Sequence, residues 1–259
     1  MSFTPPLFLL ENMNTQKLNE AICNLQKYAQ GEECGDYFTR VAKKARVFHT
    51  GRVVKAARPA RKAKKYNFDE TFELQIGLKN YDPKKDPRFN QQLVLPHLPK
   101  TNMKILVLAD ANDCNRCQAD KIEFFPFDQL ASTFDKTKPA PIKRWAKKYD
   151  VILCSKSQIK NIVKVLGPTL TKINRQPVPL EPTDNLVSKI DDMKHTIRVQ
   201  FKKVLGLNYP VGKVSDKPED IQRNIILTVN TLIDNLKKGW QNVKSIHVHT
   251  TMGPSKRVL

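Results

Sequence analysis

The stretch MKILVLA, Met103 to Ala109, decides how this chain is organised. It is a continuous apolar run, which is typical of a parallel strand covered by helices on both faces. A second such run, VILCS from Val151 to Ser155, follows a helical pattern over Lys143–Tyr149. Strands that alternate with helices indicate a small α/β unit, and we place it at residues 101–185. The Pro-rich stretches PHLPK and QPVPLEP beside it are read as connectors.

The segment after the second run predicts a helix with a defined start and end. Ser155 and Gln158 have the spacing of a capping box. The apolar positions that follow are Ile159, Ile162, Val163 and Leu166, and Gly167-Pro168 then predicts the end of the helix.

The two ends of the chain share a different pattern, in which only one face of each element is apolar. Over Phe68–Leu78 apolar and polar residues alternate, which predicts a half-exposed strand. The same alternation returns over residues 197–202 and 245–250, with an amphipathic helix over 221–236 between them. A shorter strand is expected at residues 93–95.

We therefore predict an α/β protein of two domains. The first is a discontinuous α+β domain built from both chain ends, residues 1–100 and 186–259. The second is the α/β unit at residues 101–185, inserted between them.

The N-terminal region holds a helix and then a basic segment. Leu18, Ile22 and Leu25 have helical spacing within residues 13–30. Residues 31–66 contain GRVVKAARPARKAKK, with seven Lys or Arg between Arg52 and Lys65 and no apolar face. This extra insertion is interpreted as a basic arm or as a helix that forms on a polyanion. A merely solvated run of charge is the alternative, and residues 1–12 also look added.

The charge balance indicates the kind of partner. There are 45 basic and 25 acidic residues, a net charge of +20. A polyanion, and RNA ahead of DNA, is the expected partner, while an acidic protein surface and an anionic membrane stay open. We expect no signal peptide and no membrane span, since no apolar run approaches the ~18 residues that a span needs. Five irregularly spaced cysteines favour a reducing compartment.

No set of residues in the sequence has the pattern of a catalytic or metal site. Cys114 and Cys117 form a single C-x-x-C pair, which is read as plain cysteines ahead of zinc or redox chemistry. His247 and His249 share one side of a strand without a third ligand. The aspartates after the first buried strand lack a Gly-rich phosphate loop. We predict no enzyme, no metal and no cofactor.

The positive prediction is an RNA-binding surface. Small hydroxyls can bond ribose, glycine permits close approach of the backbone, and exposed Phe or Met can lie on sugars or bases. Lysine and arginine can contact phosphates. The candidate residues are Phe68, Glu70, Thr71, Lys202, Lys203, Lys213, Thr250, Thr251, Met252, Gly253, Lys256 and Arg257. A turn that merely ends a sheet is the alternative interpretation of the last segment.

Several segments resemble one family in the right order. They are FDETFELQIGLKNYDP (68–83), KKYDVILCSKSQIKNIVKVLGP (147–168), FKKVLGLNYPVGKV (201–214), LKKGWQNVKSIHVHTTMG (236–253) and TMGPSKR near the end. On these segments the chain resembles the L-one family of large-subunit ribosomal proteins, in its eukaryotic branch. The resemblance covers about residues 13–30 and 66–259.

The resemblance implies a fold and a function. It implies that the inserted domain is Rossmann-like and that the first domain binds large-subunit rRNA. It implies a mobile stalk beside the tRNA exit site, with deacylated tRNA and other ribosomal proteins as partners. It also implies a monomer within the cytoplasmic ribosome, with assembly in the nucleolus. The implied RNA contacts are Phe68, Glu70, Thr71, Thr251, Met252 and Gly253.

The chain departs from the family pattern at three places. Asn67 stands where the family usually has a basic residue, and Thr169–Lys172 replace a Gly-rich run. Residues 31–65 have no family counterpart. A non-ribosomal nucleolar assembly factor and a nucleic-acid-processing enzyme are the alternative functions.

Overall fold

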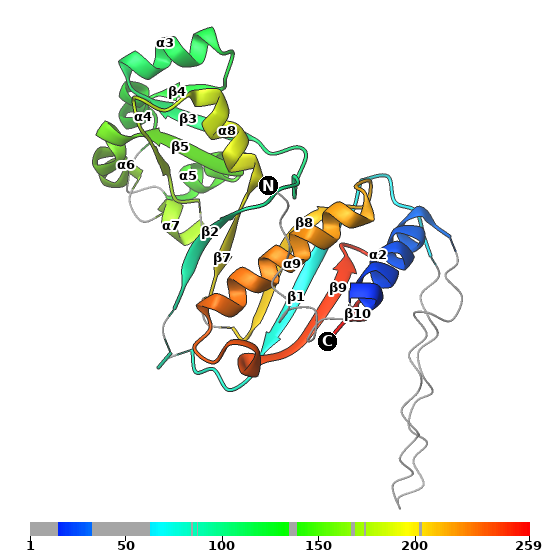
Figure 1. The fold of residues 1–259 in the computed structure, drawn as a ribbon. Coiled ribbons are helices and arrows are strands. Elements are labelled where there is room, and N and C mark those ends of the chain that lie inside the picture. The colour runs from blue at the N-terminus through cyan, green and yellow to red at the C-terminus, as the bar shows by residue number, and fades with distance from the viewer. Residues whose placement is uncertain are drawn as a thin grey trace, which may run out of the picture. The chain divides into compact units, whose positions relative to one another are not determined.

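The computed structural model describes residues 15–32, 63–83, 85–86, 88–134, 139–166, 169–173, 175–201 and 204–259. It is a mixed α/β structure with antiparallel and parallel sheets (Figure 1). The chain divides into two compact units, residues 1–99 with 197–259 (unit 1) and residues 100–196 (unit 2). The predicted basic arm and the first twelve residues lie largely outside the described residues.

Unit 1 is built on a four-stranded antiparallel sheet in the order β10-β9-β1-β8. Its strands are β1 (Thr71–Leu78), β8 (Gly206–Lys213), β9 (Val243–Thr250) and β10 (Lys256–Arg257). The helices α2 (Thr15–Gln30) and α9 (Pro218–Asn235) pack on this sheet, and the 3-10 helix η3 (Gly239–Asn242) precedes β9. A separate two-stranded sheet pairs β2 (Asn90–Val94) with β7 (Thr196–Gln200).

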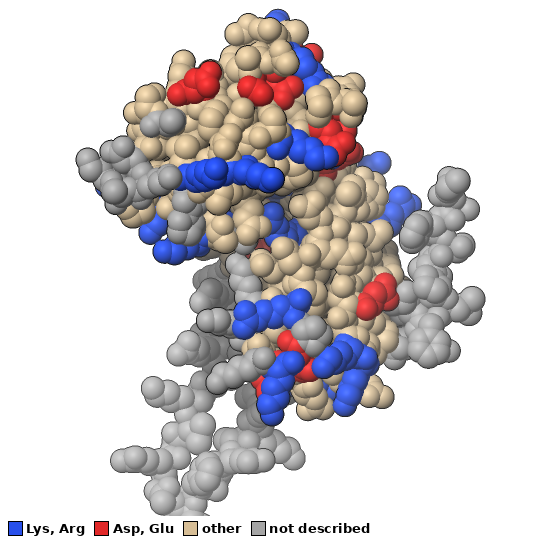
Figure 2. Space-filling model, turned by 90° about the vertical axis from the view of Figure 1, so that its left-hand side faces the viewer, with Lys and Arg blue, Asp and Glu red and all other residues tan. Residues whose placement is uncertain are grey.

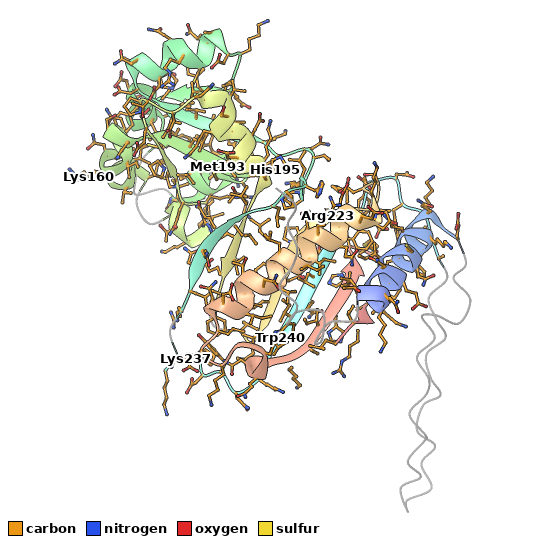
Figure 3. All side chains as sticks on the ribbon, in the orientation of Figure 1. Lys160, Met193, His195, Arg223, Lys237 and Trp240 are labelled. Atoms are coloured by element: carbon orange, nitrogen blue, oxygen red, sulfur yellow. The ribbon has the colours of Figure 1, made fainter. Side chains whose placement is uncertain are left out.

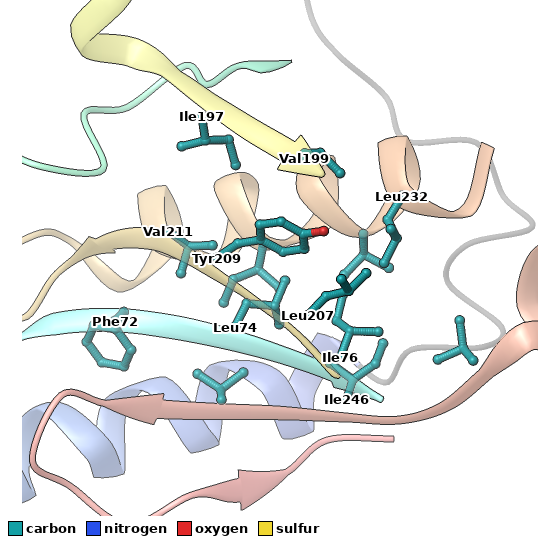
Figure 4. Packing of buried hydrophobic residues seen from close by; sticks show 14 of the residues in the cluster. Phe72, Leu74, Ile76, Ile197, Val199, Leu207, Tyr209, Val211, Leu232 and Ile246 are labelled. Carbon is teal, nitrogen blue, oxygen red and sulfur yellow. The ribbon is translucent and has the colours of Figure 1, made fainter. Parts of the chain in front are cut away.

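The core of unit 1 lies between the sheet and its helices (Figure 4). The predicted alternation in β1 is confirmed, because Phe72, Leu74 and Ile76 are fully buried and Gln75 between them is exposed. Burying each such side chain contributes about 1.5–3 kcal/mol. The predicted helices over 13–30 and 221–236 are found as α2 and α9, so the apolar periodicity placed both correctly.

Unit 2 is a parallel sheet covered by helices on both faces. Its strand order is β4-β3-β5-β6, with β3 (Ile105–Ala109), β4 (Phe124–Pro126), β5 (Val151–Ser155) and β6 (Val178–Leu180). One apolar cluster joins the sheet to α4 (Phe127–Thr133), α5 (Pro139–Ala146), α6 (Ile159–Leu166) and α7 (Thr169–Ile173). Another joins it to α3 (Ala111–Ala119) and α8 (Leu186–His195). The two apolar runs are thus the central strands, as expected for doubly covered strands.

The end of unit 2 differs from the boundary proposed at residue 185. The helix α8 buries Leu186, Ile190 and Met193 in the same cluster as Val107 and Leu153. Its apolar face therefore belongs to unit 2, which continues to residue 196.

The capping box expected at Ser155 is wrong. The Ser155 side chain makes no cap hydrogen bond, and a 3-10 turn, η2 (Lys156–Gln158), precedes α6. Its hydroxyl instead donates to a carboxylate oxygen of Asp113 and accepts from the Asp110 backbone N–H at 3.2 Å. The Ser155 hydroxyl thus bonds to a carboxylate that is distant in the chain, instead of capping the helix that follows it.

Candidate RNA-binding surface

Three segments meet at one end of the unit 1 sheet, where β1 begins and where β8 and β9 end. In the sheet register Thr71 lies opposite Lys213 on one side, and Phe72 lies opposite Thr250 on the other. We call residues 66–71, 213–216 and 250–253 the strand-end surface. The sheet brings together residues that are separated by some 180 positions in the chain.

The turn after β9 is held to the start of β1 by hydrogen bonds. The Thr251 N–H donates to the Thr71 carbonyl oxygen at 3.1 Å. The Thr71 N–H donates to the Thr251 hydroxyl oxygen at 3.2 Å, and that hydroxyl donates to the Thr71 carbonyl at 3.3 Å. The Thr251 hydroxyl is therefore engaged within the protein, although its side chain is exposed.

Glu70 and Thr250 lie beneath the surface and shape the turn. Glu70 is 4% exposed and accepts from the Met252 N–H at 3.2 Å. Thr250 is fully buried, and its hydroxyl oxygen accepts from the Gly253 N–H at 3.1 Å. The expectation that both side chains contact RNA is revised accordingly, because burial leaves them to position the turn rather than to bind.

Gly253 stands where a side chain would collide with the turn. A Cβ atom at this position would lie 2.2 Å from the Thr250 Oγ1. Real Cβ atoms do not approach another heavy atom so closely, so glycine is needed here for a close approach rather than for an unusual backbone angle.

Two large apolar side chains project from this end of the sheet. Phe68 is 50% exposed and Met252 is 45% exposed. The ring of Tyr66 lies 5.9 Å from that of Phe68, and Lys64 Nζ lies 5.5 Å from the centre of the Tyr66 ring. Apolar groups of this size, ringed by polar ones, are a common mark of an interaction site.

The segment 213–216 is fixed from two sides. Lys213 Nζ donates to the Asp69 carbonyl at 2.8 Å, and the Ser215 hydroxyl donates to the Asp69 carboxylate at 2.9 Å. From α2, the Gln26 amide donates to the carbonyls of Val214 and Asp216. A pocket of about 320 Å³ opens here, lined by residues 29–30, 65–70 and 214–215.

Sequence reasoning missed the supporting residues Gln26, Asp69, Tyr66 and Ser215. Gln26 is a polar residue of a helix that is predicted from its apolar positions alone. The carbonyls to which it donates lie about 190 residues later in the chain. No local pattern in the sequence signals such a pairing.

The basic candidates do not all lie at the strand end. Lys256 and Arg257 follow the turn and pair with Val248 and His247 along the edge strand β10. Lys202 and Lys203 lie outside the described residues. Only Lys213 among the predicted cations is shown at the strand-end surface.

The cysteine and histidine pairs considered in the sequence analysis have the following surroundings. Burial raises the pKa of the Cys117 thiol to about 11, which disfavours the thiolate that redox chemistry needs. His249 Nε2 lies 3.9 Å from a Glu73 carboxylate oxygen on the open sheet face. Among the described residues no three His, Cys, Asp or Glu side chains gather as metal ligands. The described helices include none long and apolar enough to cross a bilayer.

The fold and this surface define a strongly basic α/β protein with polar and exposed apolar side chains gathered at one end of its antiparallel sheet. Residues 60–254 match the ribosomal protein L1p/L10e family, and the chain belongs to that family. This membership agrees with the prediction that the chain is not an enzyme.

The similar proteins come from several eukaryotes. The large ribosomal subunit protein uL1 of Drosophila melanogaster is 43% identical over 195 residues, covering 75% of this chain and 89% of the relative. Protein uL1B of Schizosaccharomyces pombe is 45% identical over the same shares. Protein uL1z of Arabidopsis thaliana is 42% identical, covering 76% and 90%.

Proposed function

We propose that this protein is a constituent of the large ribosomal subunit and binds large-subunit rRNA through the strand-end surface. In this proposal it forms the mobile stalk beside the tRNA exit site and assists release of deacylated tRNA. It acts as a monomer among other ribosomal proteins in the cytoplasm, after assembly in the nucleolus. The names of its relatives, all large-subunit proteins, support the ribosomal assignment.

One observation carries the assignment of the surface. The turn 250–253 is bonded to Glu70 and Thr71 and places exposed Met252 at the sheet end from which exposed Phe68 also projects. A turn that merely ended a sheet would need neither buried carboxylate nor exposed aromatic and thioether groups. A rigid turn also loses little entropy when it meets a ribose–phosphate chain.

The test measures binding of the purified protein to the stalk region of large-subunit rRNA over a salt series. A scrambled RNA of equal length is the reference. Shape-specific binding predicts a preference that survives moderate salt, whereas purely electrostatic binding weakens equally for both RNAs.

Two variants test whether specific binding to the stalk RNA depends on the strand-end surface. Thr251→Val removes the hydroxyl that is bonded to Thr71, and Met252→Asp replaces an apolar contact with a negative charge that faces a polyanion. Each is expected to weaken binding to the stalk RNA by about 1–3 kcal/mol. Val187→Asp is the matched control for Met252→Asp, because Val187 is 48% exposed on α8 of unit 2. Unchanged affinity in both surface variants overturns the assignment.

A further inference from the structure

Unit 2 carries charge of opposite sign on the two faces of its sheet. The segment 139–175, which contains α5, α6 and α7, has nine Lys or Arg and one Asp. The segments 110–126 and 181–195, which contain α3 and α8, have eight Asp or Glu against four Lys or Arg. The helices α5, α6 and α7 pack on one face of the sheet together with α4, which adds the single acidic residue Asp128, and α3 and α8 pack on the other face. The charge of each segment therefore lies mainly on one face.

Most of the cations on the first face have no acidic partner. Asp150, the acidic residue of the segment, is already engaged with Lys100 and Arg175, and Lys156 pairs with Glu181. The remaining cations are exposed, and the described residues offer none of them an ion pair. They are Lys143, Arg144, Lys147, Lys148, Lys160, Lys164 and Lys172, and we call them the α5–α7 cations.

The spacing of these cations repeats from turn to turn. The Lys147 N–H donates to the Lys143 carbonyl, so these two side chains lie one helical turn apart. Lys160 and Lys164 are separated by four residues on α6, about 6 Å along its axis. Like charges at this spacing repel each other and destabilise a helix. A surface that served only solubility would mix both signs instead.

The figures agree with this arrangement. Figure 3 labels Lys160 at the outer side of α6. In Figure 2, Lys and Arg side chains lie in a band over unit 2, while Asp and Glu gather nearer its upper end. Among the described residues of α5, α6 and α7, Val163 is the one large apolar side chain that is exposed, at 57%. A face with so little exposed apolar area favours a polyanion in water over a bilayer.

We propose that the α5–α7 cations form a second RNA-binding surface, which contacts the phosphate backbone of a double-stranded RNA segment without reading its sequence. The proposal rests on the proposed function in one respect, that the partner of this protein is RNA. It adds that unit 2 itself binds RNA, through point charges on helices rather than through a shaped turn.

The first experiment removes three charges from the face. The variant Lys147→Gln/Lys160→Gln/Lys164→Gln is compared with Lys121→Gln/Lys189→Gln/Lys194→Gln, which removes the same charge from the segments containing α3 and α8. Both full-length proteins are titrated with double-stranded RNA of arbitrary sequence over a salt series. The slope of log affinity against log salt should fall in magnitude by about 2–3 in the first variant, at ~0.9 for each of three lost phosphate contacts on a duplex. It should change little in the second.

A second measurement uses the unaltered protein. Lysine acetylation followed by mass spectrometry should show Lys147, Lys160 and Lys164 protected by the RNA, with Lys121 and Lys189 modified as before. Polyglutamate at equal charge concentration should protect the three lysines far less. Equal protection by polyglutamate overturns the choice of RNA over an acidic protein.

The outcomes separate this proposal from the proposed function. Equal salt slopes for the two triple variants, or no protection of the three lysines, overturn the second surface while leaving the strand-end surface untouched. Loss of discrimination for stalk RNA in Met252→Asp, with double-stranded binding retained, supports both surfaces acting independently.

Discussion

At the scale of single residues, the strand-end turn depends on fitted small groups. Thr250 is buried below the turn and accepts the Gly253 N–H, while Glu70 accepts the Met252 N–H. The exposed residues that we assign to RNA binding are thus held by residues that RNA would not touch. Substitutions of Glu70 or Thr250 should affect folding as well as binding, whereas substitutions of the exposed Phe68 or Met252 side chains should affect mainly binding.

Gly253→Ala should strain the turn, because its Cβ would lie 2.2 Å from the Thr250 Oγ1. We expect a loss of about 1–3 kcal/mol in stability from overpacking and a clear loss of affinity for stalk RNA. Denaturant unfolding and RNA titration measure the two effects. In a Thr250→Ala background the added cost should shrink, since the clashing oxygen is gone. Gly206→Ala, which meets nothing within 4 Å, is the control.

Glu70→Ala should leave the Met252 N–H without its partner. The free energy of unfolding should fall by about 1–3 kcal/mol, the cost of an unsatisfied buried group. Glu70→Gln should cost less, since an amide oxygen still accepts the bond. Chemical denaturation measures the change in stability, and hydrogen exchange at the Met252 N–H reports its protection. An equal loss of stability in both variants would contradict the role of Glu70 as the hydrogen-bond acceptor.

At the scale of elements, one buried amide connects α9 to two other segments of unit 1. The Asn224 side-chain N–H group donates to the carbonyl of Val211 on β8 at 2.7 Å and to that of His97 at 3.1 Å. Asn224 is 1% exposed, so water does not replace these bonds. Periodicity explains why α9 forms, whereas Asn224 explains how the helix is positioned against the sheet.

Asn224→Ala should lower stability by about 1–3 kcal/mol for each carbonyl left unsatisfied. The midpoint of urea unfolding should fall while the slope stays constant. Asn161→Ala, on the exposed surface of α6, should have little effect. A loss in Asn224→Ala no larger than in this control would show that the side chain does not position α9.

At the scale of the whole molecule, stability should depend on pH through His247 on the open sheet face. Burial, followed by Arg257 and His249, lowers the pKa of His247 below its usual 6.5. The unfolded chain therefore binds the proton more readily than the folded one. Stability present above pH 6.5 is lost as the pH falls through the folded pKa.

His247→Gln should flatten this dependence. Thermal or urea unfolding between pH 7 and pH 5 should show a smaller loss of stability in the variant than in the unaltered protein. Asn161→Ala on α6, which removes no titratable group, should keep the original dependence. An unaltered pH profile in His247→Gln would be inconsistent with the depressed pKa.

The helices and strands whose burial follows a local period could be predicted from the sequence alone. The two apolar runs became β3 and β5, the alternating stretch became β1, and the amphipathic stretches became α2 and α9. The spacing of apolar residues in each element shows which side faces the core, and this spacing can be seen from neighbouring residues alone. The binding candidates Phe68, Met252 and Gly253 came from residue type and from the family resemblance.

Which candidate residues are exposed, and which residues hold them in place, depends on tertiary contacts. Ser155 bonds to Asp113 instead of capping a helix. Glu70 and Thr250 are buried and support the turn 250–253, and α8 belongs to unit 2. Ser155 and Asp113 are 42 residues apart, and Glu70 and Met252 are 182 residues apart, so these interactions have no local signature in the sequence. The separation of charge on unit 2 also depends on tertiary structure, because the sheet topology places α4 to α7 on one face and α3 and α8 on the other.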